Sequence, residues 1–227
     1  MKQKEILSNM KENKEITGTA KHIFNGSIES PVRDDAFVLD DEIKIELIEK
    51  HFKEIMQILG LDLSDDSLKG TPHRVAKMYV KEVFKGLNPA NKPIAKLFEN
   101  KYQYKQMLVE KDISFYSNCE HHFVPIIGRA HLGYISNGKV VGLSKLNRIV
   151  RYFAARPQVQ ERMTIQIANE LREVLQTDDI AVLIEADHLC VASRGIQDIT
   201  SKTVTSEYSG KFLDTKTREE FFRYIGI

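Results

Sequence analysis

Apolar positions divide the chain into a helical part followed by a part with alternating periodicity. Over residues 43–59 they recur every three or four positions and stop at Gly60, which favours an amphipathic helix. The stretch 71–86 has the same spacing and predicts a second helix. From residue 107 the period falls to two, so 107–117 predicts a strand. Apolar stretches on both sides of Asn137-Gly138 predict two further strands joined as a β-hairpin.

The rest of the chain mixes both patterns. Residues 144–157 and 156–176 predict two helices, 179–193 returns to strand, and 217–225 reads as a short helix. We therefore expect a single α+β domain over residues 40–227 with an antiparallel sheet. Its parts are a helical segment, 40–88, and a sheet segment, 105–227. Residues 1–39 are polar and lysine-rich, which predicts an N-terminal extension that is flexible or ordered by a partner.

Composition narrows the function classes. The 227 residues are 42% hydrophobic, and 33 Lys and Arg nearly balance 32 Asp and Glu. This balance argues against nucleic acid or an acidic membrane as partner. No apolar run is long enough for a membrane span or resembles a signal peptide, so we expect a cytoplasmic protein. The two cysteines, Cys119 and Cys190, are then expected to be reduced.

The stretch "NCEHHFVPI", residues 118–126, carries the strongest candidate chemistry. Cys119 and His122 have the short spacing that wraps a turn around a tetrahedral ion, whereas His121 is expected to point elsewhere. Cys190 would supply a third ligand, and it shares a strand face with His188 if that segment is extended. Two thiols and one imidazole with an open fourth position are typical of a catalytic zinc. Ordinary buried cysteines are an equally consistent interpretation.

His121 and His188 flank these ligands and exceed what a structural zinc site uses. An imidazole has a pKa near neutrality, so both are candidates for general acid and base.

A second group of residues suits an anion. Ser144 is expected to cap its helix, with Lys145 and Arg148 on one face, and a helix N-terminus with two cations suits a phosphate. Arg74 and Arg194 could add charge. Solvated surface cations are the simpler interpretation of any one of them.

Gln160 and Glu161 open the long helix that follows. A carboxylate there could accept two parallel hydrogen bonds from guanine, which adenine cannot donate. It could equally serve only to complement the helix dipole.

Four long motifs, taken together, resemble those of GTP cyclohydrolase I. They are "CEHHFVPI", "GLSKLNRIVRYFAARPQVQERM", "DHLCVASRGI" and "DDSLKGTPHRVAKMY", and the resemblance runs from about Asp40 to the C-terminus. It implies hydrolysis and ring rearrangement of GTP to 7,8-dihydroneopterin triphosphate and formate, the first step of tetrahydrofolate and pterin biosynthesis.

The resemblance also implies roles for single residues. It implies one zinc ion per subunit on Cys119, His122 and Cys190, and catalytic roles for His121 and His188. Guanine would be recognised by Gln160 and Glu161, and the triphosphate by Ser144, Lys145, Arg148 and Arg194. Arg74 would reach a neighbouring subunit's site. The implied fold is the tunnelling fold, an antiparallel sheet with helices packed on one side, which assembles into barrels and here into a homodecamer with active sites at subunit interfaces.

Two other functions are also consistent with these residues. Other tunnelling-fold enzymes use a cysteine nucleophile with a nicotinamide cofactor, and Cys119 could be such a thiolate, although its pairing with His122 argues against it. A zinc-stabilised scaffold that binds GTP without turnover is the non-enzymatic alternative.

Overall fold

The computed structural model describes residues 29–227. Most of the expected N-terminal extension, residues 1–28, lies outside the described residues, so the division at residue 39 stays a prediction. Within the described part of the chain no helix is long and apolar enough to cross a membrane.

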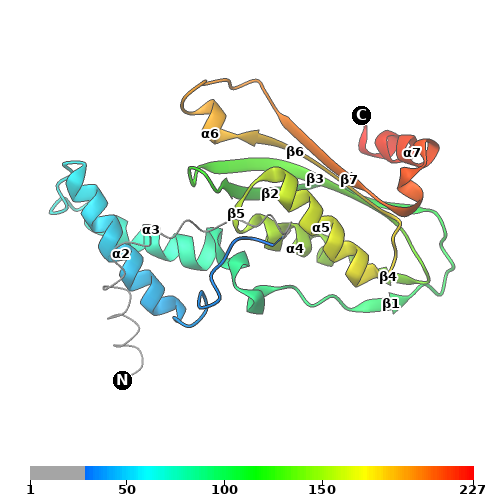
Figure 1. Cartoon of the computed structure of the whole chain (residues 1–227), viewed down its shortest axis with the longest axis horizontal. Helices are drawn as coiled ribbons and strands as arrows, with labels where there is room; N and C mark the ends of the chain where they lie inside the picture. The colour runs from blue at the N-terminus through cyan, green and yellow to red at the C-terminus, as the bar shows by residue number, and fades with distance from the viewer. Residues whose placement is uncertain (1–28) are drawn as a thin grey trace, which may run out of the picture.

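Two antiparallel helices form the N-terminal part, at the opposite end of the molecule from the C-terminal helix (Figure 1). Helix α2 spans Asp41–Ile58, and the Asp40 side chain caps it by accepting from Ile43 N at 2.9 Å. Helix α3 spans Thr71–Met78 and continues directly into a π-helical turn, η1, at Tyr79–Val83. Both predicted helices are confirmed. Two 3-10 turns follow, η2 at Lys85–Leu87 and η3 at Pro89–Asn91.

A five-stranded sheet forms the centre of the fold. Its order is β5-β2-β3-β6-β7, and all neighbours are antiparallel except the two-residue parallel pair of β5 with β2. The strands are β2 (Met107–Cys119), β3 (Pro125–Ile135), β5 (Pro157–Gln158), β6 (Ile180–His188) and β7 (Thr203–Tyr208).

The predicted hairpin at Asn137-Gly138 is wrong. The chain turns there, but β4 (Lys139–Val141) pairs with β1 (Leu97–Glu99) in a separate two-stranded sheet. The physical reason is that β3 already has β2 on one edge and β6 on the other, so neither edge is free for β4.

The main core lies between one face of the sheet and two helices, α4 (Leu143–Ala154) and α5 (Gln160–Leu175). Alternate residues of β6, Val182 and Ile184, face this core, while Ala181 and Leu183 face a smaller cluster on the other side. That second cluster contains Phe212 of η4 (Gly210–Leu213) and two residues of α7 (Thr215–Ile225). The α+β class with a mainly antiparallel sheet is thereby confirmed, and the C-terminal helix adds a cover on the opposite face.

Candidate functional site

Three potential metal ligands meet where β2 and β6 end beside the start of β3. Cys119 is the last residue of β2, His122 lies in the loop to β3, and Cys190 lies in the short helix α6, Leu189–Ala192. One ligand atom from each lies within 4.8 Å of the other two. Register explains this meeting, because Asn118 pairs with Pro125 and Ile126 pairs with His188. Cys119 and Cys190, 71 positions apart in the sequence, are therefore adjacent in space.

The route by which Cys190 reaches the site differs from the prediction. Strand β6 ends at His188, and Cys190 lies on a helical turn, so the two residues do not share a strand face. The turn lets the thiol approach Cys119 while His188 remains on the sheet.

The donor set fits a soft divalent cation. Burial and the neighbouring Cys119 thiol raise the pKa of Cys190. Two neighbouring thiols disfavour a second negative charge, and a divalent cation removes this penalty by binding both thiolates. Two sulfurs and one imidazole nitrogen are ligands that zinc prefers. Cys119 is buried while His122 is exposed, so the cluster could bind a metal ion that faces solvent on one side.

Both loop histidines lie close to Cys119, whereas His121 was expected to point elsewhere. The Nδ1 atoms of His121 and His122 lie 3.6 and 4.0 Å from Cys119 Sγ. The segment is a tight turn instead of a strand or helix, and the N–H groups of His122 and Phe123 both point to Cys119 O. Only His122 also lies within reach of Cys190.

Arg194 lies at the same site. Its Nη1 donates to His122 Nε2 at 2.9 Å, and because guanidinium cannot accept, the Nε2 atom carries the lone pair. A metal ion bound to Nε2 would take the lone pair that Arg194 now uses. A metal ion bound to Nδ1 would leave the ring proton on Nε2, which could then no longer accept from Arg194. Metal binding at His122 would thus release Arg194.

His188 is oriented by a buried hydrogen-bond network. Gln160 is 1% exposed, and its Nε2 lies 3.0–3.1 Å from three acceptors, Ile184 O, Thr203 O and Thr205 Oγ1, which share its two hydrogens. Because the two carbonyl oxygens among them can only accept, the amide nitrogen must face them. The other end of the amide, Oε1, then lies 2.8 Å from His188 Nε2. Nε2 must then carry the proton, which leaves Nδ1 as acceptor. Burial lowers the pKa of His188, while Glu161 and Asp187 oppose this shift.

The first turn of α5 also anchors the metal loop. Glu161 is exposed there, close enough to influence His188. Arg162 forms an ion pair with Glu120 and also donates to Gln158 Oε1 at 3.2 Å. Glu120 N donates to Gln158 O at 3.0 Å. Glu120 therefore holds the loop against β5 through its backbone and against α5 through its side chain.

The predicted triphosphate contacts of α4 and α3 are not brought to this cluster in one chain. Lys145 and Arg148 line a separate cavity with Lys85 and Arg151. The helix begins after Gly142 without a side-chain cap, so the prediction of Ser144 as N-cap is wrong. Gly142 already adopts the extended conformation of a cap, which leaves Ser144 inside the first turn.

Arg74 is likewise apart from the cluster. Its Nη2 donates to Ser67 O and Thr71 Oγ1 at 3.0 and 2.8 Å. No hydrogen bond or ion pair within residues 29–227 joins it to the metal ligands.

Three features of the site were not foreseen from the sequence. They are the Arg162–Glu120 pair, the role of Gln160 in orienting His188, and an aromatic contact of Phe123 described below. Each joins segments far apart in the chain, and no local pattern marks such pairs. The positive φ of Phe123, 53°, likewise has no sequence signal because the residue is not glycine.

A possible metal centre with adjacent histidines, built on an antiparallel sheet, defines a candidate metal-dependent enzyme. The GTP cyclohydrolase I family model matches residues 48–226. A GTP cyclohydrolase 1 from Flavobacterium johnsoniae is 61% identical over 204 residues, 90% of this chain and 92% of that protein. One from Citrobacter koseri is 51% identical over 199 residues, 87% of this chain and 90% of that protein. This chain belongs to the GTP cyclohydrolase I family.

Among solved structures, a dihydroneopterin aldolase from Burkholderia thailendensis with bound guanine is similar with a TM-score of 0.32 and 14% identity. The match covers 47% of this chain and 93% of that one.

Proposed function

We propose that this protein converts GTP and water to 7,8-dihydroneopterin triphosphate and formate, the first step of tetrahydrofolate and pterin biosynthesis. Family membership supports the reaction. The observation that carries the proposal is the convergence of Cys119, His122 and Cys190 within 4.8 Å, beside a histidine whose ring is oriented by a buried amide.

The proposed cofactor is one zinc ion per subunit, held by Cys119, His122 and Cys190. Zinc in such a site is a Lewis acid that makes water nucleophilic near neutral pH. The chain's own contribution is to fix three ligands and leave one side open, where C8 of the guanine would be presented.

His121 and His188 are proposed to move protons. His188 donates from Nε2 to Gln160, so its Nδ1 lone pair is available to take a proton. His121 is exposed beside Cys119, where a bound base could reach it. Both histidines belong to segments held by the sheet, which favours a constant distance between them and the substrate.

Substrate binding is assigned to two groups of residues. Glu161 and Gln160 would recognise guanine at the start of α5, with Gln160 acting largely through His188 because its amide is already bonded. Arg194, released from His122, would contact the triphosphate together with Ser144, Lys145 and Arg148. The triphosphate would hold the base in position by contacts remote from C8.

A homodecamer with active sites between subunits would complete this site. Lys145 and Arg148 lie at a cavity apart from the metal ligands, and Arg74 is bonded within its own helical part. Neighbouring copies could supply these cations. Strand β7 pairs only with β6 among the described strands, and such a sheet edge favours pairing with another copy into a barrel.

Metal analysis of the purified protein tests this proposal. We expect about one zinc per subunit in the wild type, as one ligand set requires. Cys190→Ala should lose both zinc and pterin formation, whereas His51→Ala, at an exposed histidine of α2, should keep both. A wild type without zinc whose thiol forms a covalent substrate adduct would overturn the assignment.

A further inference from the structure

Phe123, the residue directly after His122, belongs to a cluster of three aromatic rings. Its ring centroid lies 5.1 Å from that of Phe84 and 6.3 Å from that of Tyr79. Tyr79 and Phe84 are themselves 5.2 Å apart. Distances and tilts of this size are those of favourable aromatic pairs. The cluster therefore joins the metal-site loop to the N-terminal helical part.

The π-helical turn Tyr79–Val83 builds the receiving side of this cluster. Phe84 N donates to Tyr79 O at 3.1 Å, the five-residue bond of a π turn. In an α-helix, residues five apart would point about 140° away from each other. The wider turn instead brings both rings to one side, where Phe123 meets them.

The loop backbone at Phe123 is held in an unusual conformation. Its φ is 53°, in the left-handed region that a residue with a side chain rarely adopts. Phe123 N donates to Cys119 O at 2.8 Å, and Asn118 Nδ2 donates to Phe123 O at 3.1 Å. These two bonds hold the Phe123 backbone against the end of β2, and the contacts of its ring with Tyr79 and Phe84 add a restraint from outside the loop.

We propose that Phe123 is a positioning residue for the metal site. Its ring, held by Tyr79 and Phe84, keeps the loop in the conformation that presents His122 to Cys119 and Cys190. The helical part of the chain thereby sets the geometry of a metal site that it does not itself ligate. This inference rests on the metal site proposed above.

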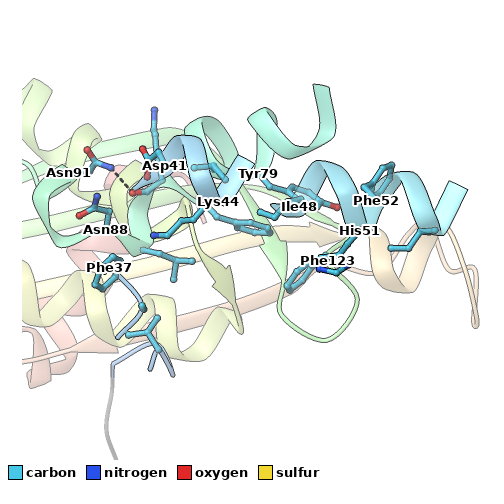
Figure 2. Close-up of a pocket in the computed structure, with 17 residues that line it drawn as sticks. Phe37, Asp41, Lys44, Ile48, His51, Phe52, Tyr79, Asn88, Asn91 and Phe123 are labelled. Atoms are coloured by element: carbon cyan, nitrogen blue, oxygen red, sulfur yellow. Dashed lines mark hydrogen bonds between the residues drawn. The ribbon is translucent and has the colours of Figure 1, made fainter. Parts of the chain in front are cut away.

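The surroundings of the ring argue against a simple packing role. Phe123 is 47% exposed. One side borders an apolar cavity of about 620 Å³, which it lines together with Phe37, Phe52 and Tyr79 (Figure 2). The aromatic contacts with Tyr79 and Phe84 restrain the ring beside this open space. Removing the ring should therefore disturb the loop more than it disturbs the stability of the fold.

Zinc affinity, measured by competition with a chromophoric chelator, tests this proposal apart from activity. The variants are Phe123→Ala and Phe123→Gly, since glycine adopts the positive φ freely but also lacks the ring. Phe98→Ala is the matched control, because Phe98 is 51% exposed on β1, far along the chain from the loop. Tyr79→Leu removes a partner of the ring and serves if a Phe123 variant does not fold.

We expect both Phe123 variants to bind zinc about 10- to 100-fold more weakly, as for other residues that orient metal ligands. Their Tm should stay close to that of Phe98→Ala, and excess zinc should restore much of kcat. Tyr79→Leu should weaken zinc in the same direction. Unchanged zinc affinity in the Phe123 variants would overturn the proposal, and so would weakening in Phe123→Ala but not Phe123→Gly, which would assign the effect to the backbone.

Failure of this inference differs from failure of the proposed function. A wild type that binds no zinc contradicts the metal site itself. A wild type that binds zinc and turns over GTP, with Phe123 variants of equal zinc affinity, contradicts only the positioning role.

Discussion

Gln160 Oε1 accepts a hydrogen bond from His188 Nε2 at 2.8 Å, and the two hydrogens of the amide nitrogen are shared among three acceptors. A buried side chain on one helix therefore selects the tautomer of a histidine at the end of a strand. The same amide ties α5 to β6 and to β7, so the orientation of His188 depends on the packing of the main core.

Gln160→Ala should lower kcat while leaving zinc content unchanged. The variant frees the ring of His188 and its tautomer, and we expect a loss up to about 100-fold, within the range of a positioned acid or base. The free energy of unfolding should also fall by about 1–3 kcal/mol because buried acceptors lose their donor. Steady-state kinetics with metal analysis measures this. Thr205→Val removes only one of the partners of Gln160, so its kcat should fall much less than that of Gln160→Ala. Equal kcat in the two variants would contradict the role of Gln160.

His121 and His122 should separate by function. His122→Ala is expected to lose zinc and activity together, whereas His121→Ala should retain zinc and lose most turnover. The distances to Cys119, 3.6 and 4.0 Å, make this comparison informative because either ring is near the thiol. Metal content and pterin formation are measured on the same samples. Zinc loss confined to His121→Ala would show that the two roles are exchanged.

Glu161→Gln should raise the apparent Kd for GTP. A carboxylate that accepts two bonds from guanine would lose one of them, which costs about 1–3 kcal/mol if the contact is buried. Inosine triphosphate lacks the exocyclic amine, so the penalty should shrink with that ligand. Glu173→Gln, at an exposed position of the same helix, is the control. An equal penalty for both nucleotides would argue against base recognition by Glu161.

His131 should make folding stability depend on pH. It is buried on β3, where Nδ1 accepts from Asp112 N at 3.3 Å, and burial lowers its pKa. The Asp112 and Glu185 carboxylates oppose this shift, and Arg129 and Lys111 add to it. The unfolded chain, with a histidine pKa of about 6.5, then binds a proton first as pH falls.

The stabilising contribution of neutral His131 is therefore complete above pH about 6.5 and is lost as pH falls from there through the lowered folded pKa. Urea unfolding at pH about 7.5 and about 5.5, at fixed protein concentration, measures it. His131→Asn keeps an acceptor near the position of Nδ1 and should flatten the dependence. His51→Asn, at an exposed site, should leave the pH dependence as it is in the wild type. If stability changes with pH equally in both variants, His131 is not the cause.

Periodicity predicted the elements well because burial repeats along a helix or strand. Residues 43–59 and 71–86 became helical, and the strand predicted at 107–117 lies in the sheet. The strand predicted at 179–193 is confirmed only over β6, because its last residues form α6. The pairing of β4 with β1 escaped prediction, since chain order does not show which strand edges are already occupied. The π turn at Tyr79–Val83 also has no periodic signature, since it directly continues α3 and the apolar spacing of 71–86 is that of one helix.

The convergence of Cys119, His122 and Cys190 was predictable because the two cysteines are the chain's only thiols and His122 has the required spacing. The local conformation of Cys190 could not be predicted. The apolar residues around it suit the end of a strand as well as the short helical turn that the structure has there. Contacts between remote segments, such as Gln160 with His188, require the fold. The assignment of Lys145 and Arg148 to the triphosphate rests on their place near a helix N-terminus and on the family resemblance, and in a single chain they lie at another cavity.

GTP carrying an isotopic label at C8 tests the central claim most directly. Incubated with the zinc-loaded protein, the label should leave as formate in equal amount to the pterin product, and removal of zinc by a chelator should stop both. GTP that binds tightly while the label stays in the nucleotide would contradict the proposed reaction.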